Sequence, residues 1–344
     1  MNHNHLVFGA GLIGCYLGGA IALSGQSVRL LCRAKIQKNL QDGIKLTDYL
    51  GHQALINSIQ FCQAIEQGAT PFGIIWLTVK CTDVATACEQ MQCFVDTHTR
   101  IICCQNGLGS EQIVKQAFPH NQVLRAMVPF NVVEMDKGHF HRGSAGTLTI
   151  ESDNCEEQFV EQLIAQINSD LLPVESSADM DSLLWAKLQL NLGNSVNALA
   201  DIPVKAMLEQ RGYRLVVAGL MKELLAVTKA KNIVLPKVTA VPAQLIPYIL
   251  RLPNILFKRV ANQMLAIDPN VKTSMWWDLS RGKATEIDHL NGAVVQAGDR
   301  LNISCPANQK IISLIKSIQH GEVNAPKRPI SAEQLYQLVF SEQN

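Results

Sequence analysis

Residues 6–28 read LVFGAGLIGCYLGGAIALSGQSV, a stretch of 23 residues that holds six glycines and no Asp, Glu, Lys or Arg. Its length would suit a bilayer, whose hydrocarbon core takes about 20 apolar residues to cross. The spacing Gly14-x-x-x-Gly18 would also suit a contact between membrane helices. A membrane span is therefore one hypothesis for this stretch, and the order of its residues tests it.

That order favours a nucleotide-binding turn. Residues 6–8 form a short apolar strand, residues 12–23 have a helical pattern, and residues 27–32 read as a second strand. Between the first strand and the helix lies a G-x-G-x-x-G loop, which begins the first unit of a dinucleotide-binding fold. Its glycines allow a tight turn, backbone approach to a pyrophosphate and close helix packing, and the helix N-terminus faces the phosphates. The predicted cofactor-binding residues here are Gly9, Ala10, Gly11, Leu12, Ile13 and Gly14.

The end of the second strand indicates which dinucleotide is bound. NAD-binding proteins usually carry Asp or Glu about 20 residues after the first glycine, to bind the ribose 2′-hydroxyl. Here the strand ends in Cys-Arg-Ala-Lys, and no carboxylate occurs between Gly9 and Lys35. A guanidinium can pair with a 2′-phosphate through charge-assisted hydrogen bonds. We therefore predict NADP(H), with Arg33 as the selecting residue and Lys35 as a second cation.

Composition narrows the class of protein. A chain of 344 residues suggests two domains. The formal net charge of +1 gives no electrostatic reason to expect nucleic acid or an anionic membrane as partner. No basic segment precedes the apolar stretch, so a signal peptide is not expected. The ten cysteines include no C-x-x-C pair and the nine histidines lack ligand spacing, so we expect reduced thiols, no metal site and a cytoplasmic location.

The rest of the chain divides into two parts. Residues 73–79 and 100–104 read as buried parallel strands that run into polar residues, the edge at which open α/β sheets bind ligands. Further strands are expected around 123–133 and 138–150, and the chain becomes helical from about residue 176. The predicted fold class is α/β, with a doubly wound Rossmann-type sheet in residues 1–175 and an all-helical substrate domain in residues 176–330.

One lysine stands out in the helical part. Residues 183–200 read LLWAKLQLNLGNSVNALA, in which Lys187 is the only charged residue. On one continuous helix, Lys187, Asn191 and Asn194 would form a polar stripe. Leu184 and Leu188 would flank the stripe on one side and Leu183 and Leu190 on the other. Burying an ammonium group is costly unless it is paired or has a functional role. Burial also lowers its pKa toward the range that suits proton transfer. The alternative is a lysine that extends to solvent beside two structural asparagines.

A late acidic segment, residues 285–292, reads TEIDHLNG. On a helix, Glu286, Leu290 and Ala293 would share a face, whereas Asp288 and His289 would point elsewhere. A first-turn glutamate is often only a charge favoured by the helix dipole. The residue pattern alone therefore does not favour Glu286 over Asp288 as a functional residue.

Taken together, these residues resemble the ketopantoate reductase (2-dehydropantoate 2-reductase) family over nearly the whole chain. Besides the glycine loop, the matching motifs are Leu77-Thr-Val-Lys80, Gln105-Asn-Gly-Leu-Gly109, Leu184-Trp-Ala-Lys-Leu188 with Asn191, Ser274-Met275, and Thr285-Glu-Ile-Asp288 with Asn291-Gly292. The resemblance implies NADPH-dependent reduction of 2-dehydropantoate to pantoate, a step of pantothenate biosynthesis. It also implies Lys187 as proton donor, Asn191 and Ser274 as substrate contacts, and Asn106 where substrate and cofactor meet. Lys80 and Glu286 would order the nicotinamide side, and Val132 would make a backbone contact with the cofactor.

The sequence departs from the family's pattern at two places. The family's second helix asparagine falls on Ser195, with Asn194 adjacent, so either residue is a candidate for that position. Residues 236–268 form a long apolar, proline-rich insert. It could line a different pocket, form a lid or make an oligomer contact, for example in a homodimer.

The function we expect is hydride transfer to the ketone of a small 2-oxo acid. Its nearest rival is a related NADP-dependent reductase of another 2-oxo acid or hydroxy acid. A non-catalytic NADP-binding regulator is a rival of another class, which an intact set of Lys187, Asn191 and Glu286 disfavours.

Overall fold

The computed structural model describes residues 4–57, 59–62, 70–153, 155–261 and 269–341. The chain divides into two compact units, Met1–Met180 and Asp181–Asn344. The first unit therefore extends five residues beyond the expected boundary at 175, because strand β12 (Val174–Ser177) belongs to its sheet. The second unit includes α16 (Ala332–Phe340), which packs against α9 (Arg211–Ala230) and lies beyond the expected end at 330.

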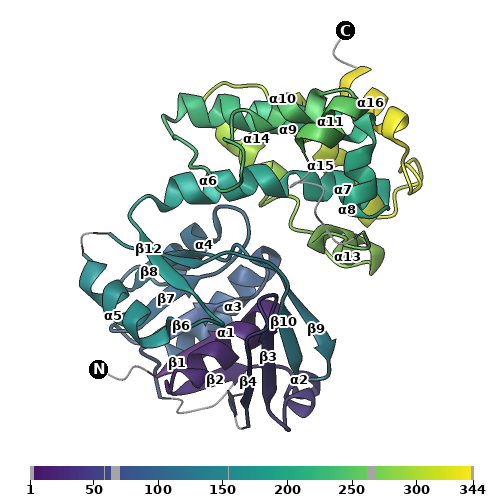
Figure 1. The fold of residues 1–344 in the computed structure, drawn as a ribbon. Helices are drawn as coiled ribbons and strands as arrows, with labels where there is room; N and C mark the ends of the chain where they lie inside the picture. The colour runs from purple at the N-terminus through teal and green to yellow at the C-terminus, as the bar shows by residue number, and fades with distance from the viewer. Residues whose placement is uncertain (1–3, 58, 63–69, 154, 262–268, 342–344) are drawn as a thin grey trace. The chain divides into compact units, whose positions relative to one another are not determined.

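The main sheet of the first unit has the predicted doubly wound form. In the described residues it contains eight strands in the order β12-β11-β8-β7-β6-β1-β2-β5. All neighbouring pairs are parallel except β11 and β8. The strands are β1 His5–Phe8, β2 Val28–Leu31, β5 Gln60–Cys62, β6 Ile74–Leu77, β7 Arg100–Cys103, β8 Gln122–Met127, β11 Leu148–Glu151 and β12. Figure 1 shows this sheet with helices around it.

Helices cover both faces of this sheet, so its central strand β6 is apolar at every position and its neighbours β1 and β7 are apolar after their first residue. Alternate strand residues such as Val7, Trp76 and Ile102 pack with α1 (Leu12–Leu23) and α5 (Glu157–Ile167). The intervening residues, such as Phe8 and Ile75, pack with α3 (Val84–Met91) and α4 (Ser110–Ala117). Short 3-10 turns at Cys81–Asp83 and Gln92–Phe94 flank α3. The strand-loop-helix-strand order predicted for residues 6–32 is confirmed, and α1 has the predicted bounds.

A second sheet was not predicted. It has the order β4-β3-β10-β9, with β3 Ile44–Asp48, β4 Gln53–Ile56, β9 Val132–Asp136 and β10 His139–Arg142. The sheet packs on α1, where a Cβ at Gly19 would lie 3.2–3.3 Å from side-chain atoms of Ile44 and Leu46. A short helix, α2 (Ala34–Asn39), precedes it in the chain.

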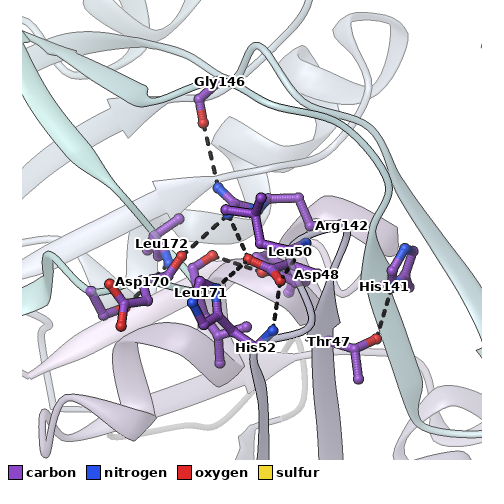
Figure 2. A network of polar contacts seen from close by, with 12 residues as sticks. Thr47, Asp48, Leu50, His52, His141, Arg142, Gly146, Asp170, Leu171 and Leu172 are labelled. Atoms are coloured by element: carbon purple, nitrogen blue, oxygen red, sulfur yellow. Dashed lines mark hydrogen bonds and ion pairs between the residues drawn. The ribbon is translucent and has the colours of Figure 1, made fainter.

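A buried ion pair joins this sheet to the main one. Asp48 and Arg142 lie opposite each other at the ends of the parallel strands β3 and β10. Their side chains are almost fully buried, and Arg142 Nη2 donates to Asp48 Oδ2 at 2.9 Å. Arg142 also donates to the carbonyls of Asp170 and Gly146, which belong to the turns before β12 and β11 (Figure 2). One guanidinium thus connects three segments that are distant in sequence.

The same carboxylate holds the turn between β3 and β4. Asp48 Oδ1 accepts the backbone N–H groups of Leu50 and His52 at 3.0 and 2.9 Å, and Oδ2 lies 2.9 Å from His52 Nδ1. Burial by itself would raise the pKa of Asp48. The hydrogen bonds from His52, Arg142 and Leu50 more than offset this effect and lower the pKa to about 2.

The second unit is helical throughout its described residues. Its central helix, α9, contacts α7 (Gly193–Ala200), α8 (Val204–Glu209), α10 (Ile246–Arg251), α14 (Asn291–Arg300), α15 (Pro306–Gln319) and α16. The remaining helices are α6 (Met180–Asn191), α11 (Asn254–Val260) and α13 (Ser274–Ser280). In the described chain, no helix has both the length and the apolar character that crossing a bilayer requires.

None of the ten cysteines forms a disulfide in the structure, and most of them are buried. Burial raises the pKa of Cys15 to about 12 and that of Cys305 to about 11. Only Cys93 and Cys155 are exposed.

Candidate active site

The glycine loop has the geometry that a pyrophosphate needs. Gly9 adopts a φ of +113°, and a Cβ there would lie 2.8 Å from the backbone nitrogen of Val79. A Cβ on Gly14 would lie 2.1 Å from the carbonyl oxygen of Gly9, so only glycine allows the helix to approach the turn. The Cβ position of Gly11 instead faces open space. The loop therefore fits a phosphate group that approaches the backbone at Gly11.

The start of α1 leaves its first N–H groups available. Gly11 is the N-cap residue, no side chain caps the helix, and no acidic residue lies in its first turn. Backbone N–H groups and the positive end of the helix dipole attract anions. Leu12 and Ile13 are the first two residues of α1.

Arg33 lies at the same edge of the sheet as this loop. Phe8 and Leu31 are paired residues on the parallel strands β1 and β2, and Arg33 follows two residues after Leu31. It is exposed and forms the N-cap position of α2, and Lys35 is exposed in the first turn. No acidic residue lies in that first turn. Two cations, Arg33 and Lys35, thus follow β2 at the edge of the sheet where the glycine loop lies.

Two further polar loops follow β6 and β7 at this edge, since Leu77 pairs with both Phe8 and Cys103 in parallel register. Lys80 lies in the first loop and is exposed, and Asn106 lies in the second and is half-buried. Gln105 joins the loops, because its Nε2 donates to the carbonyls of Leu77 and Val79 at 2.7 and 3.1 Å.

A thiol makes a second connection between these loops. Cys81 Sγ donates to the carbonyl of Asn106 at 2.8 Å. The sequence analysis assigned no role to Gln105 or Cys81. Their contacts between the two loops can be recognised only once β6 and β7 are known to be neighbours. Val132 begins β9 in the second sheet, with its side chain buried in the core. A cofactor contact at Val132 would therefore involve its main chain.

In the second unit, Lys187 lies on α6 and is half-buried. Leu184 and Leu188 are buried as expected. The sequence also predicts leucines that bury the other side of the polar stripe. This prediction is wrong, since Leu190 is 36% exposed and Leu183 is only half-buried. The lysine therefore lies at the border between the helical core and a more open surface.

The single helix expected over residues 183–200 is also interrupted. α6 ends at Asn191 and α7 begins at Gly193. Ser195 Oγ donates to the carbonyl of Leu192 at 3.0 Å, and such a side-chain bond competes with the helical ladder. Leu192 keeps right-handed helical angles, so α7 continues close to the direction of α6.

The two candidates for the second amide position differ in burial. Asn194 is half-buried, as is Asn191, whereas Ser195 is fully buried and its hydroxyl is bonded within its own helix. Ser274 is exposed as the first residue of α13. Thr273, just before it, donates to the carbonyl of Asn194 at 3.3 Å. The structure therefore brings the chain segments at 194 and 274 together.

The acidic segment does not form the expected helix. α14 begins at Asn291, and residues 286–290 form a turn that is anchored where Thr285 N and Oγ1 each donate to Gln319 Oε1 at 3.0 Å. Glu286 is buried in this turn, at 9% exposure. Asp288 is exposed and pairs with Lys316 at 2.7 Å. The structure thus distinguishes the two acidic residues by their burial, which the sequence alone did not do.

Comparison with known proteins assigns the chain to a family. A model described as ketopantoate reductase PanE/ApbA matches residues 5–154, and the model of the C-terminal part of the same family matches residues 179–319. Among curated relatives, 2-dehydropantoate 2-reductase of Archaeoglobus fulgidus is 23% identical over 318 residues. That match covers 92% of this chain and 97% of the relative.

Solved structures share the fold over the same length. A PanE/ApbA family ketopantoate reductase from Ralstonia eutropha JMP134 is 27% identical with a TM-score of 0.74, covering 92% of this chain and 99% of that one. A D-mandelate dehydrogenase, solved with NADH and anilino(oxo)acetate, is 17% identical with a TM-score of 0.76 and the same coverage. Because the two family models together span most of the sequence, the chain belongs to the ketopantoate reductase PanE/ApbA family, and it is an oxidoreductase that binds a nicotinamide cofactor.

Proposed function

We propose that the protein reduces the ketone of 2-dehydropantoate to the hydroxyl of pantoate, with NADPH as the preferred cofactor and Lys187 as the proton donor. The observation that carries this proposal is the position of Lys187. It is the only charged residue in 182–200, it is half-buried beside Leu184 and Leu188, and Asn191 lies one helical turn away.

Lys187 would complete the reaction at the carbonyl oxygen. When bound, NADPH supplies a hydride to the carbonyl carbon, and negative charge develops on the oxygen. The ammonium group of Lys187 would stabilise that charge and donate its proton, which leaves a hydroxyl and a neutral amine that water reprotonates. Asn191 and Ser274 would donate hydrogen bonds to the carboxylate and hydroxyl groups of the substrate. For the second amide position we propose Asn194, because the hydroxyl of Ser195 is buried and already bonded.

The first unit would hold the cofactor. The loop of Gly9, Ala10, Gly11, Leu12, Ile13 and Gly14 would bind the pyrophosphate, in keeping with the open space at Gly11. Arg33 would bind the 2′-phosphate. Lys80 and Asn106 would contact the nicotinamide side, together with Glu286 and the main chain of Val132.

A second candidate substrate is another small 2-oxo acid. The observation in its favour is the insert at 236–268, whose described part contributes α10 and α11. Gln189, two residues after Lys187, donates from Nε2 to the carbonyl of Ala243 at 2.8 Å. The insert therefore packs on the helix that carries the proposed proton donor, where it can influence which side chains of a substrate are accepted.

The test is a panel of 2-oxo acids with NADPH or NADH oxidation as readout, on the wild type, Lys187→Ala and Lys222→Ala. Lys222 is an exposed helical lysine of the same unit and serves as the matched control. We expect 2-dehydropantoate to be the best substrate and Lys187→Ala to lose at least a hundredfold in kcat, within the range that general acids contribute. NADPH binding should be retained.

Turnover by Lys187→Ala within a few-fold of the wild type would exclude the assigned proton donor. NADPH binding without turnover of any acid would favour the non-catalytic regulator. Assembly as a homodimer and a cytoplasmic location stay predictions, of which the first is measured by light scattering coupled to gel filtration.

A further inference from the structure

A buried amide connects α7 to the segment that begins α13. Asn197 is fully buried, and its Oδ1 accepts both the backbone N–H and the hydroxyl of Thr273, each at 3.1 Å. Its Nδ2 donates to the carbonyl of Ile202 at 2.7 Å. The amide of Asn197 is thus occupied on both sides and cannot reach a substrate.

Thr273 makes the complementary contacts. It is the N-cap residue of α13, where its Oγ1 accepts the N–H of Trp276. The same oxygen lies 3.3 Å from the carbonyl of Asn194 and 3.1 Å from Asn197 Oδ1, so its single hydrogen is shared between two acceptors. Thr273 therefore bonds one turn of α7 at two residues, and Ser274 is the next residue in the chain.

A second connection lies one turn further along. Asp201, which follows α7 with a φ of 54°, accepts a hydrogen bond from Trp276 Nε1. Arg328 Nη2 lies 3.1 Å from the same carboxylate. The N-terminal turn of α13 is thus fixed to α7 by its cap and by an indole.

From these contacts we infer that Asn197 and Thr273 are positioning residues for substrate binding. They hold Asn194 and Ser274, which lie 80 residues apart in sequence, at a fixed separation. The inference rests on the proposed function, since it requires that these two residues contact the 2-oxo acid. A contact displaced by about 1 Å can cost a large factor in rate, so the half-buried hydroxyl of Thr273 can affect the reaction without touching the substrate.

Thr273→Val tests this inference with little change in shape, because it removes the hydroxyl and keeps the backbone N–H that bonds Asn197. Thr273→Ser restores the hydroxyl. Thr228→Val is the matched control, since Thr228 is a buried helical threonine of α9 whose Oγ1 donates to the carbonyl of Leu225 within the same helix. Each variant is assayed for kcat, the KM of the oxo acid, the Kd of NADPH, the Kd of the hydroxy acid by calorimetry, and Tm.

We expect Thr273→Val to raise the KM of the oxo acid and the Kd of the hydroxy acid at least tenfold, with the Kd of NADPH within twofold of wild type. Thr273→Ser should return both values to within threefold. Thr228→Val should lower Tm by a similar amount and leave KM unchanged. If Thr273→Val and Thr228→Val behave alike, the hydroxyl has only a structural role and the inference is wrong.

Two further outcomes are decisive. If Thr273→Val does not fold, Trp276→Phe replaces it, because it removes the indole N–H and keeps a ring. An unchanged KM in Trp276→Phe then overturns the inference, and an increase of about threefold supports it. If the wild type reduces no 2-oxo acid, the proposed function fails and this inference with it, whereas an active wild type with an unaffected Thr273→Val refutes the inference alone.

Discussion

Replacing Asp48 by Asn should strongly destabilise the first unit, because the change leaves a buried guanidinium without its counter-charge. Arg142 is only 2% exposed, and Asp48 provides its carboxylate partner (Figure 2). Removal of one partner from a buried ion pair typically costs about 3–5 kcal/mol, because the remaining charge loses its compensation. The neutral amide of Asn can still accept some of the N–H groups that Asp48 binds. We therefore expect a loss near the lower end of that range, about 3 kcal/mol.

The pKa of Asp48 gives a second way to calculate how much its ionised carboxylate contributes to the free energy of unfolding. It falls from an ordinary value of 3.8 to about 2, and each pKa unit corresponds to about 1.4 kcal/mol. Because the folded state holds the lower pKa, the ionised carboxylate stabilises the fold at every pH above 3.8. This stability is lost as the pH falls through 2. The contribution is about 2 kcal/mol in full, and about 1 kcal/mol of it is lost by pH 3.

Urea unfolding followed by circular dichroism at pH 7, 5, 4 and 3 measures both quantities. Asp42→Asn is the control, because Asp42 is exposed in the loop before β3. Between pH 5 and 3, the wild type should lose about 1 kcal/mol more than Asp48→Asn does. Equal stability of Asp48→Asn and Asp42→Asn at pH 7, or parallel pH profiles of wild type and Asp48→Asn, would refute the reasoning.

Three other changes have defined outcomes. Gly14→Ala should weaken NADPH binding at least tenfold in a fluorescence titration, because its Cβ would lie 2.1 Å from the carbonyl oxygen of Gly9; unchanged affinity would mean that the loop tolerates the shift. Arg33→Ala should raise the KM of NADPH about tenfold or more, the value of a charged hydrogen bond, and leave the KM values of NADH and the oxo acid nearly unchanged; equal effects on both cofactors would reject Arg33 as the selector. Glu286→Gln should lower kcat/KM, whereas Asp288→Asn should not, since Asp288 is an exposed residue in a surface ion pair; the reverse order would contradict this ranking.

Much of the first unit could be predicted from sequence because its signals are local. The bounds of α1 follow from the glycine loop before it and from Ser24 and Gly25 after it. The strands β6 and β7 are buried on both faces, so β6 is a continuous apolar run and β7 is apolar after Arg100. Parallel order then places Lys80 and Asn106 at one edge without further information.

Features that depend on distant pairing could not be predicted. The second sheet has short strands, and β9 shows four exposed residues after Val132, which gives no alternating pattern. The partnership of Asp48 and Arg142 requires the register of two strands 94 residues apart.

In the candidate site, sequence identified the residue types but not their surroundings. The Ser195 hydroxyl donates to the carbonyl of Leu192 at the break between α6 and α7, and this bond is the reason that we propose Asn194 for the second amide position. The N-cap role of Thr273 could have been suspected from a threonine at the start of a helical pattern. Its contacts with Asn194 and Asn197 required the packing of α13 against α7.

The distribution of cysteines has a practical consequence. Cys93 and Cys155 are exposed and both lie in the first unit, whereas Cys305 of the second unit is buried with a pKa of about 11. Because the thiolate is the reactive form, a maleimide at neutral pH should modify the first unit alone. A dye attached in this way would report on the first unit in the natural sequence, with no engineered label site.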